Sequence, residues 1–137
     1  MFKLTVVTPE RRLVLNQEID EVTVPGFRGE LNILPGHAPL ITTLETGIMR
    51  WKIKGQAQEQ VAVLSWGYCE VHPDGVEILA DMADLPEEVD VQESQQALNL
   101  AEKRLLNESL DEENWKQVQR EVARRRADLD IAKHKRV

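Results

Sequence analysis

The sequence predicts an α+β fold in which an N-terminal antiparallel β-sandwich is followed by a C-terminal two-helix hairpin. All seven glycines lie between Gly26 and Gly75, and no proline lies beyond Pro86. Short alternating apolar runs fill the first part of the chain, whereas apolar residues later recur every three or four positions. Because glycine and proline mark turns, we place the boundary between a sandwich, residues 1–84, and a hairpin, residues 85–137.

The strands of the sandwich are expected where apolar and polar residues alternate between turn residues. In the third such run, Met49 and Trp51 fall on one face and Arg50 on the other. The tetrapeptide His-Pro-Asp-Gly at residues 72–75 is a typical turn between two strands. The expected strands are Phe2–Val7, Glu18–Val24, Gly47–Lys54, Gln60–His72 and Gly75–Asp81.

Two capping signals predict the starts of the helices. Asp90 followed by Glu93 predicts a first helix that runs to about Leu106. Ser109 followed by Glu112 predicts the start of a second, which runs towards Lys135 with basic residues in its final turn. The apolar stripes of the two helices comprise Ala97, Leu98, Ala101, Leu105 and Leu106, and Trp115, Val118, Val122, Leu129 and Ala132.

The second stripe is thin, because Arg125 and Arg126 stand between Val122 and Leu129 where an apolar residue is expected. A helical pair with so few large apolar residues is too small to hold itself together, so it should depend on docking. We therefore expect a detachable arm.

Charge is distributed unevenly along the chain. Residues 116–137 hold eight basic and three acidic residues, a net +5, whereas residues 1–115 hold nine basic and 21 acidic residues, a net −12. The basic tail suits an acidic partner. Nucleic acid is disfavoured, because the acidic front would repel phosphates and no aromatic residues flank the arginines. Arg124–Arg126 are either a solvated face or a docking surface for carboxylates, and charge alone leaves both open.

No motif for catalysis, cofactor binding or metal binding stands out. The chain lacks a phosphate-binding loop, an HExxH motif and a Cys-x-x-Cys pair. His37, His72 and His134 lack ligand spacing, so His72 and His134 are expected to be solvated polar residues. Cys69 lies in an alternating segment and is expected in the core. We expect no catalytic residue, no metal ligand and no cofactor, and hence no enzyme activity from this chain alone.

The sequence also gives no sign of direct membrane insertion. No apolar run approaches the roughly 20 residues of a membrane-spanning helix. The first ten residues, MFKLTVVTPE, lack the pattern of a secretory signal.

Several segments resemble the epsilon subunit of F-type ATP synthases. They are GELNILPGHAPLIT, LETGIMR and GYCEVHPDGVEILADMAD, and the later segment DVQESQQALNLAEKRL is most similar to the cyanobacterial and plastid type. The resemblance implies a non-catalytic rotor component. Its sandwich would clamp the gamma shaft and rest on the membrane ring, and its hairpin would fold down or extend along the shaft. It also implies a place on the stromal or cytoplasmic side of the thylakoid membrane, reached only through protein partners.

The resemblance assigns roles to particular residues. Glu30 and His37 would lie on the face that contacts the membrane ring, although His37 would alternatively only complete its turn by hydrogen bonding. In the extended arm, Arg120, Arg124, Arg125 and Arg126 would face an acidic segment of the catalytic beta subunits and block ATP hydrolysis. The alpha subunits are expected as further partners.

One departure concerns nucleotide binding. Many bacterial relatives bind ATP through Ile or Leu, Asp, two variable residues, Arg and Ala, and the matching stretch here is Val89–Ser94. Glu93 replaces the arginine, and its carboxylate should repel phosphate. We therefore expect no nucleotide-binding residues. The alternative is an ATP-sensing module whose hairpin closes on the nucleotide.

Overall fold

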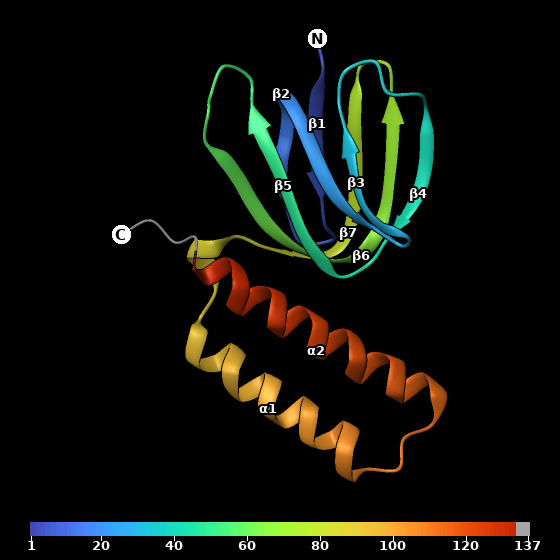
Figure 1. The fold of residues 1–137 in the computed structure, drawn as a ribbon, viewed down its shortest axis with the longest axis vertical. Helices are drawn as coiled ribbons and strands as arrows, with labels where there is room; N and C mark the ends of the chain where they lie inside the picture. Colours follow the sequence, from blue (N-terminus) through green and yellow to red (C-terminus); the bar gives the residue numbers. More distant parts are fainter. Residues whose placement is uncertain (134–137) are drawn as a thin grey trace.

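The computed structural model describes residues 1–133 and consists of a sandwich of seven strands with a two-helix hairpin at one end (Figure 1). The predicted fold class is confirmed. The strands are β1 Lys3–Val7, β2 Arg12–Gly26, β3 Gly29–Ile33, β4 Leu40–Leu44, β5 Gly47–Ile53, β6 Glu59–His72 and β7 Gly75–Asp84. A short 3-10 turn, η1 Pro86–Glu88, leads to the helices α1 Val91–Asn107 and α2 Glu112–Ala132.

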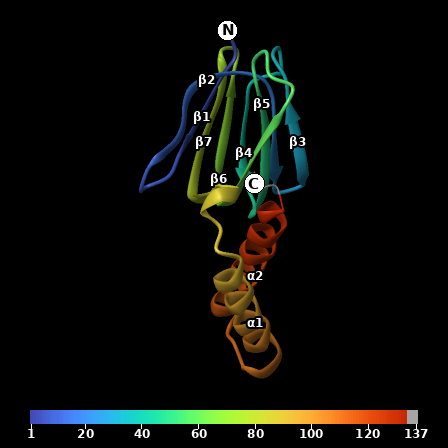
Figure 2. The ribbon, with the colours of Figure 1, turned by 90° about the vertical axis from the view of Figure 1, so that its left-hand side faces the viewer.

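Two long strands hold the sandwich together. β6 pairs with β5 through its first half, with β4 through its second half, and with β7 along most of its length. β2 similarly pairs with β1, β5 and β3 in turn. All pairings are antiparallel except that of β1 with β7, which is parallel. The strands form a sandwich that stands above the hairpin (Figure 2), and the apolar side chains between them make one core.

The core is built by the alternation that the sequence predicted. Met49 and Trp51 of β5 are buried, and the largest fully buried side chains include Leu4, Leu64 and Ile78. Cys69 is buried with them, and burial raises the pKa of its thiol to about 12. At neutral pH this thiol is therefore neutral and behaves as a small core residue.

The Gly- and Pro-rich passage contains strands that the alternation did not reveal. β2 begins at Arg12 rather than Glu18, and β3 and β4 lie within the segment that reads as turns. Between them Gly36 has φ of +89°, a conformation that glycine adopts without strain. Pro25 sits in β2 opposite Glu30, next to the tight β2–β3 turn. β3 and β4 are only five residues long and have turn residues at or near both ends, so neither shows an alternating pattern long enough to predict a strand.

The start of α1 agrees with its predicted capping signal, whereas that of α2 does not. Asp90 accepts a hydrogen bond from the Glu93 amide at 3.1 Å. The second cap is Asp111, which accepts from the Asn114 amide at 2.8 Å, and not Ser109. A carboxylate satisfies the free amides of a first turn as well as a hydroxyl does. α2 ends at Ala132, and its last turn holds no basic residue. Lys135, where the helix was predicted to end, lies outside the described residues, as does His134.

α2 lies between the sandwich and α1 (Figure 1). On one side Val118 and Val122 pack against Leu98 and Ala101 of α1. On the other side Ile131 is fully buried against the sandwich and the linker, in a cluster with Val61, Val63 and Val89. Within residues 1–133, neither helix is long and apolar enough to cross a membrane.

Candidate functional site: the arginine face of the second helix

Each of the four arginines singled out by the resemblance makes an internal contact. Arg124 Nη2 lies 3.3 Å from Asp84 Oδ2, at the end of β7, and both side chains are largely buried. Arg124 Nε is also 3.8 Å from Asp128, one turn further along α2. Arg124 therefore ties the second helix directly to the sandwich.

Arg125 joins the two helices to each other. Its Nε donates to Glu121 at 2.7 Å, and its Nη1 donates to Ser94 Oγ on α1 at 3.5 Å. Nη1 also lies 3.8 Å from Asp128. Arg125 thus occupies a nearly buried position in which carboxylates and a hydroxyl replace the apolar residue that the stripe lacks.

The other two arginines have more exposed contacts. The Arg120 guanidinium lies 5.0 Å from the ring centroid of Trp66 on β6, a cation–π contact. Arg126 Nη2 donates to Glu102 of α1 at 3.2 Å, although its side chain is 64% exposed. The docked hairpin therefore keeps all four cations near internal partners.

Asp128, which the sequence analysis did not single out, lies at the centre of this arrangement. It is only 2% exposed, and its Oδ1 has no hydrogen-bond partner within the described part of the chain. Burial, followed by the negative charge of Asp84 and a hydrogen bond to it, raises the pKa of Asp128 to about 7, against the opposing effect of Arg124 and Arg125. We call Asp84, Arg124, Arg125 and Asp128 the charge cluster. In the sequence, the only sign of it is that Asp128 follows Arg125 by three residues and Arg124 by four, a spacing that brings side chains together on a helix.

A bidentate ion pair fixes the linker to the sandwich. Arg11 Nη1 and Nη2 each lie 2.6 Å from a carboxylate oxygen of Glu88, and Nη2 also donates to the Ala83 carbonyl. The hydrogen bond from Arg11 is the main cause that lowers the pKa of Glu88. The η1 turn therefore belongs mechanically to the sandwich, so movement of the hairpin would begin after Glu88.

The two residues predicted at the membrane ring lie apart, one at the start of β3 and the other beyond its end. Glu30 is near the start of the strand, where its carboxylate accepts from Arg50 at 2.8 Å. His37 lies beyond the end of β3, where its Nδ1 donates to the Ala38 carbonyl at 2.8 Å. The structure does not join these two side chains in one contact. The hydrogen bond of His37 agrees with the alternative in which this histidine completes its turn.

The outer face of β4, β6 and β7 carries exposed apolar side chains. Ile41, Tyr68 and Leu79 are 71%, 58% and 59% exposed, and they line a shallow hollow of about 350 Å³. Tyr68 and Leu79 are direct cross-strand partners. We call these three residues the apolar patch. Contiguous exposed apolar groups of this kind mark interaction surfaces.

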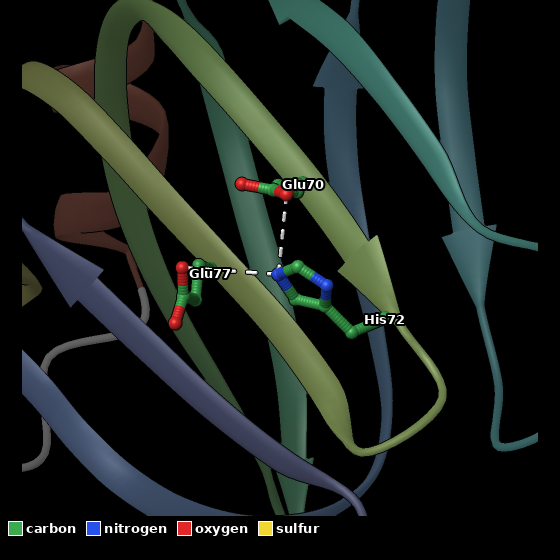
Figure 3. Close-up of side chains that lie close together, drawn as sticks. All are labelled: Glu70, His72 and Glu77. Carbon is green, nitrogen blue, oxygen red and sulfur yellow. Dashed lines mark ion pairs between the residues drawn. The ribbon is translucent and has the colours of Figure 1, made fainter.

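Beside the apolar patch, the strands bring His72 close to two carboxylates (Figure 3). His72 Nε2 lies 3.4 Å from Glu70 Oε1 and 3.9 Å from Glu77 Oε2. The spacing of histidines along the chain could not show this group, because Glu77 reaches it through the register of β6 with β7.

Comparisons with known proteins agree with this architecture. Residues 1–86 match the family model described as the beta-sandwich domain of the ATP synthase delta/epsilon chain. The ATP synthase epsilon chain of Bdellovibrio bacteriovorus is 59% identical over 130 residues, which cover 95% of this chain and 93% of that relative. That of Geotalea uraniireducens is 35% identical over 130 residues, which cover 95% and 92%.

A chain in the cryo-EM structure of the Euglena gracilis mitochondrial ATP synthase has the same fold. The TM-score is 0.81 at 24% sequence identity, with 97% of this chain and 81% of that chain covered.

The relatives correct one expectation drawn from the segment DVQESQQALNLAEKRL. They come from non-photosynthetic bacteria, so they do not support the cyanobacterial or plastid type or a thylakoid location. They are subunits of an ATP synthase, as expected for a chain without catalytic motifs. With its sandwich matched by the family model and a relative 59% identical along almost its whole length, the chain belongs to the ATP synthase delta/epsilon chain family.

Proposed function

We propose that this chain is a central-stalk subunit of a proton-driven F-type ATP synthase and that its hairpin restrains ATP hydrolysis. The observation that carries the proposal is the state of the four α2 arginines. In the docked hairpin each has an internal partner, and the partners of Arg120 and Arg124 belong to the sandwich, so these two cations become available when α2 leaves it. Arg125 and Arg126 are paired within the hairpin itself. The sandwich transmits rotation in either position of the arm.

The extended arm would inhibit by meeting the catalytic beta and alpha subunits. A single exposed ion pair contributes only about 0.2–1 kcal/mol. Four such pairs with carboxylates of a partner would together contribute up to a few kcal/mol, reduced by the internal ion pairs that Arg124, Arg125 and Arg126 give up. That is enough to shift a two-state arm by tenfold to a few hundredfold.

The apolar patch supplies the surface for the gamma shaft. Ile41, Tyr68 and Leu79 project from paired central strands, so the surface that they form is rigid. A rigid apolar surface suits a subunit that must carry torque. The stiff β3–β4 turn, with Pro35, Gly36 and His37, supplies a contact with the membrane ring. Glu30 supplies a second contact if its carboxylate leaves Arg50. The subunit then lies on the cytoplasmic side of the membrane, held only by its protein partners.

The rival function, an ATP-sensing module, is disfavoured by the surroundings of the arginines. Arg124 and Arg125 are flanked by the carboxylates of Asp84, Glu121 and Asp128. These acids, together with Glu93 in place of the family's arginine, oppose a phosphate chain. Calorimetry of the isolated chain should show no ATP binding, and a micromolar dissociation constant would favour the rival.

The inhibitory role is tested in the reconstituted complex with Arg124, Arg125 and Arg126 all changed to Glu. Hydrolysis should rise while assembly and synthesis are retained. The matched control reverses Lys103, an exposed cation on α1, and should leave hydrolysis inhibited. If the triple variant hydrolysed ATP no faster than the control, the arginines would have no part in inhibition.

The platform role is tested by the exposed patch. Leu79→Lys should weaken binding to gamma without unfolding the sandwich, because the Leu79 side chain already faces solvent. A truncation after Asp84 should retain synthesis and raise hydrolysis. Failure of the truncated sandwich to join gamma to the ring would contradict the proposed division of labour.

A further inference from the structure

We propose that Glu70, His72 and Glu77 form a binding site for a divalent transition-metal ion, with zinc as the ion that fits best. The three residues lie together on the outer face of β6 and β7 (Figure 3). Glu70 and Glu77 also line the hollow of the apolar patch, and none of the three belongs to the charge cluster. The inference does not depend on the function proposed above.

The register of two strands creates the group. Glu70 and His72 are two residues apart on β6, so their side chains point to the same side of the sheet. Glu77 of β7 is the direct cross-strand partner of Glu70. One ligand atom from each residue falls within 4.8 Å of the others.

The distances between the ligand atoms are close to those around a tetrahedral zinc ion. Zinc binds nitrogen and oxygen ligands at about 2.0–2.2 Å, so a tetrahedral ion holds neighbouring ligand atoms roughly 3.4 Å apart. The distance from His72 Nε2 to Glu70 Oε1 is 3.4 Å, and that to Glu77 Oε2 is 3.9 Å. The three ligand atoms lie within 4.8 Å of one another, so the two glutamate side chains, which are 45% and 64% exposed, must rotate inward by about an ångström to reach this spacing.

The donor set selects among metals. Two carboxylates offset the charge of a divalent ion, and a neutral imidazole favours zinc over magnesium or calcium, which prefer oxygen ligands. Three protein ligands leave at least one coordination position open. That position would take water or a donor from a partner bound at the neighbouring apolar patch.

The backbone beneath the group is fixed. The β6–β7 turn places Gly75 against β1, where a Cβ would overlap the Lys3 carbonyl oxygen. Close packing of this turn holds β6 and β7 in one register, and therefore holds His72 and Glu77 together. The Lys3 side chain lines the hollow next to His72 and opposes a bound cation.

The test is titration of the full-length chain with zinc chloride, followed by calorimetry, and with cobalt(II), followed by its visible absorption. We expect one ion per chain with a dissociation constant of about 1–100 µM at neutral pH. Lys3→Gln should strengthen binding.

His72→Ala and Glu77→Gln should each weaken zinc binding at least tenfold. His37→Ala removes a half-exposed imidazole from the β3–β4 turn and Glu45→Gln removes an exposed carboxylate, and both should bind zinc as the parent chain does. Both site variants alter exposed or half-exposed side chains, and circular dichroism checks that they remain folded. No binding at millimolar zinc, or equal binding by the parent chain and His72→Ala, would overturn the proposal.

Discussion

The sandwich and the hairpin are held by different forces. The sandwich encloses a continuous apolar core to which every strand contributes. The hairpin rests on the sandwich through one fully buried large residue, Ile131, with smaller apolar neighbours and a charge cluster that contains a buried acid without a full set of hydrogen bonds. Apolar burial is robust to pH and salt, whereas a partly satisfied charged contact is not. One region is therefore built to persist and the other to separate.

The largest expected effect comes from the sandwich core. Leu64→Ala should lower the free energy of unfolding by about 2–5 kcal/mol, because Leu64 is fully buried and leaves a cavity. Chemical denaturation with far-UV circular dichroism measures the change. Leu100→Ala is the matched control, since Leu100 is an exposed leucine of α1 and should cost about 0.5 kcal/mol or less. Equal losses in the two variants would contradict the assignment of the core.

Ile131→Ala should act on the hairpin and spare the sandwich. We expect the docking free energy of α2 to fall by about 2–4 kcal/mol, because Ile131 is its one fully buried contact with the sandwich. Hydrogen exchange should show faster exchange in α1 and α2 and unchanged exchange in β6 and β7. Faster exchange in both regions by the same factor would mean that they open as one unit.

Docking should weaken as the pH rises. The pKa of Asp128 is about 7 when docked and near its ordinary value of 3.8 when released, so the docked state retains a proton that the released state loses. The contribution of protonated Asp128 to the docking free energy is fully present below about pH 4 and is lost as the pH rises to about 7. We expect a total loss on the order of 1–3 kcal/mol.

Hydrogen exchange of α2 at several pH values, corrected for intrinsic rates, measures this dependence. Asp128→Asn keeps the shape of the side chain and removes its titration, so its docking should no longer vary across this range. Asp130→Asn, two residues away on α2, is the control and should leave the dependence in place. A parent chain that docks more tightly at pH 8 than at pH 5 would contradict the sign.

A smaller effect is expected from the ion pair between Asp84 and Arg124. A double-mutant cycle with Asp84→Asn and Arg124→Gln should give a coupling of about 0.5–1.5 kcal/mol in docking. The equivalent cycle for Glu102 and Arg126 should give less, since Arg126 is mostly exposed. A coupling near zero for both pairs would leave apolar contacts as the only force that docks the arm.

Much of the fold follows from periodicity. Alternation around Met49 and Trp51 places them in the core, and Asp90 with Glu93 marks the first helix correctly. β3 and β4 escape because each is only five residues long and is bounded by glycine or proline. The second cap shifts from Ser109 to Asp111 because several neighbouring side chains can cap a helix, and packing selects among them.

The site is less predictable than the fold. Family resemblance suggests the arginines as candidate site residues, but it does not show that Arg124 pairs with Asp84, forty residues earlier in the chain. Burial of Asp128 depends on how α2 meets β7, and the group around His72 depends on a strand register. Such pairings arise from tertiary packing between distant segments, which cannot be predicted from the composition of one segment.

Native-state hydrogen exchange with low concentrations of denaturant tests most directly whether the arm separates from the platform. We expect two levels of opening free energy at neutral pH, with the amides of α1 and α2 at least about 2 kcal/mol below those of β2, β6 and β7. A single level shared by helices and strands, with the same dependence on denaturant, would show that the hairpin unfolds only with the sandwich, which contradicts a separable arm.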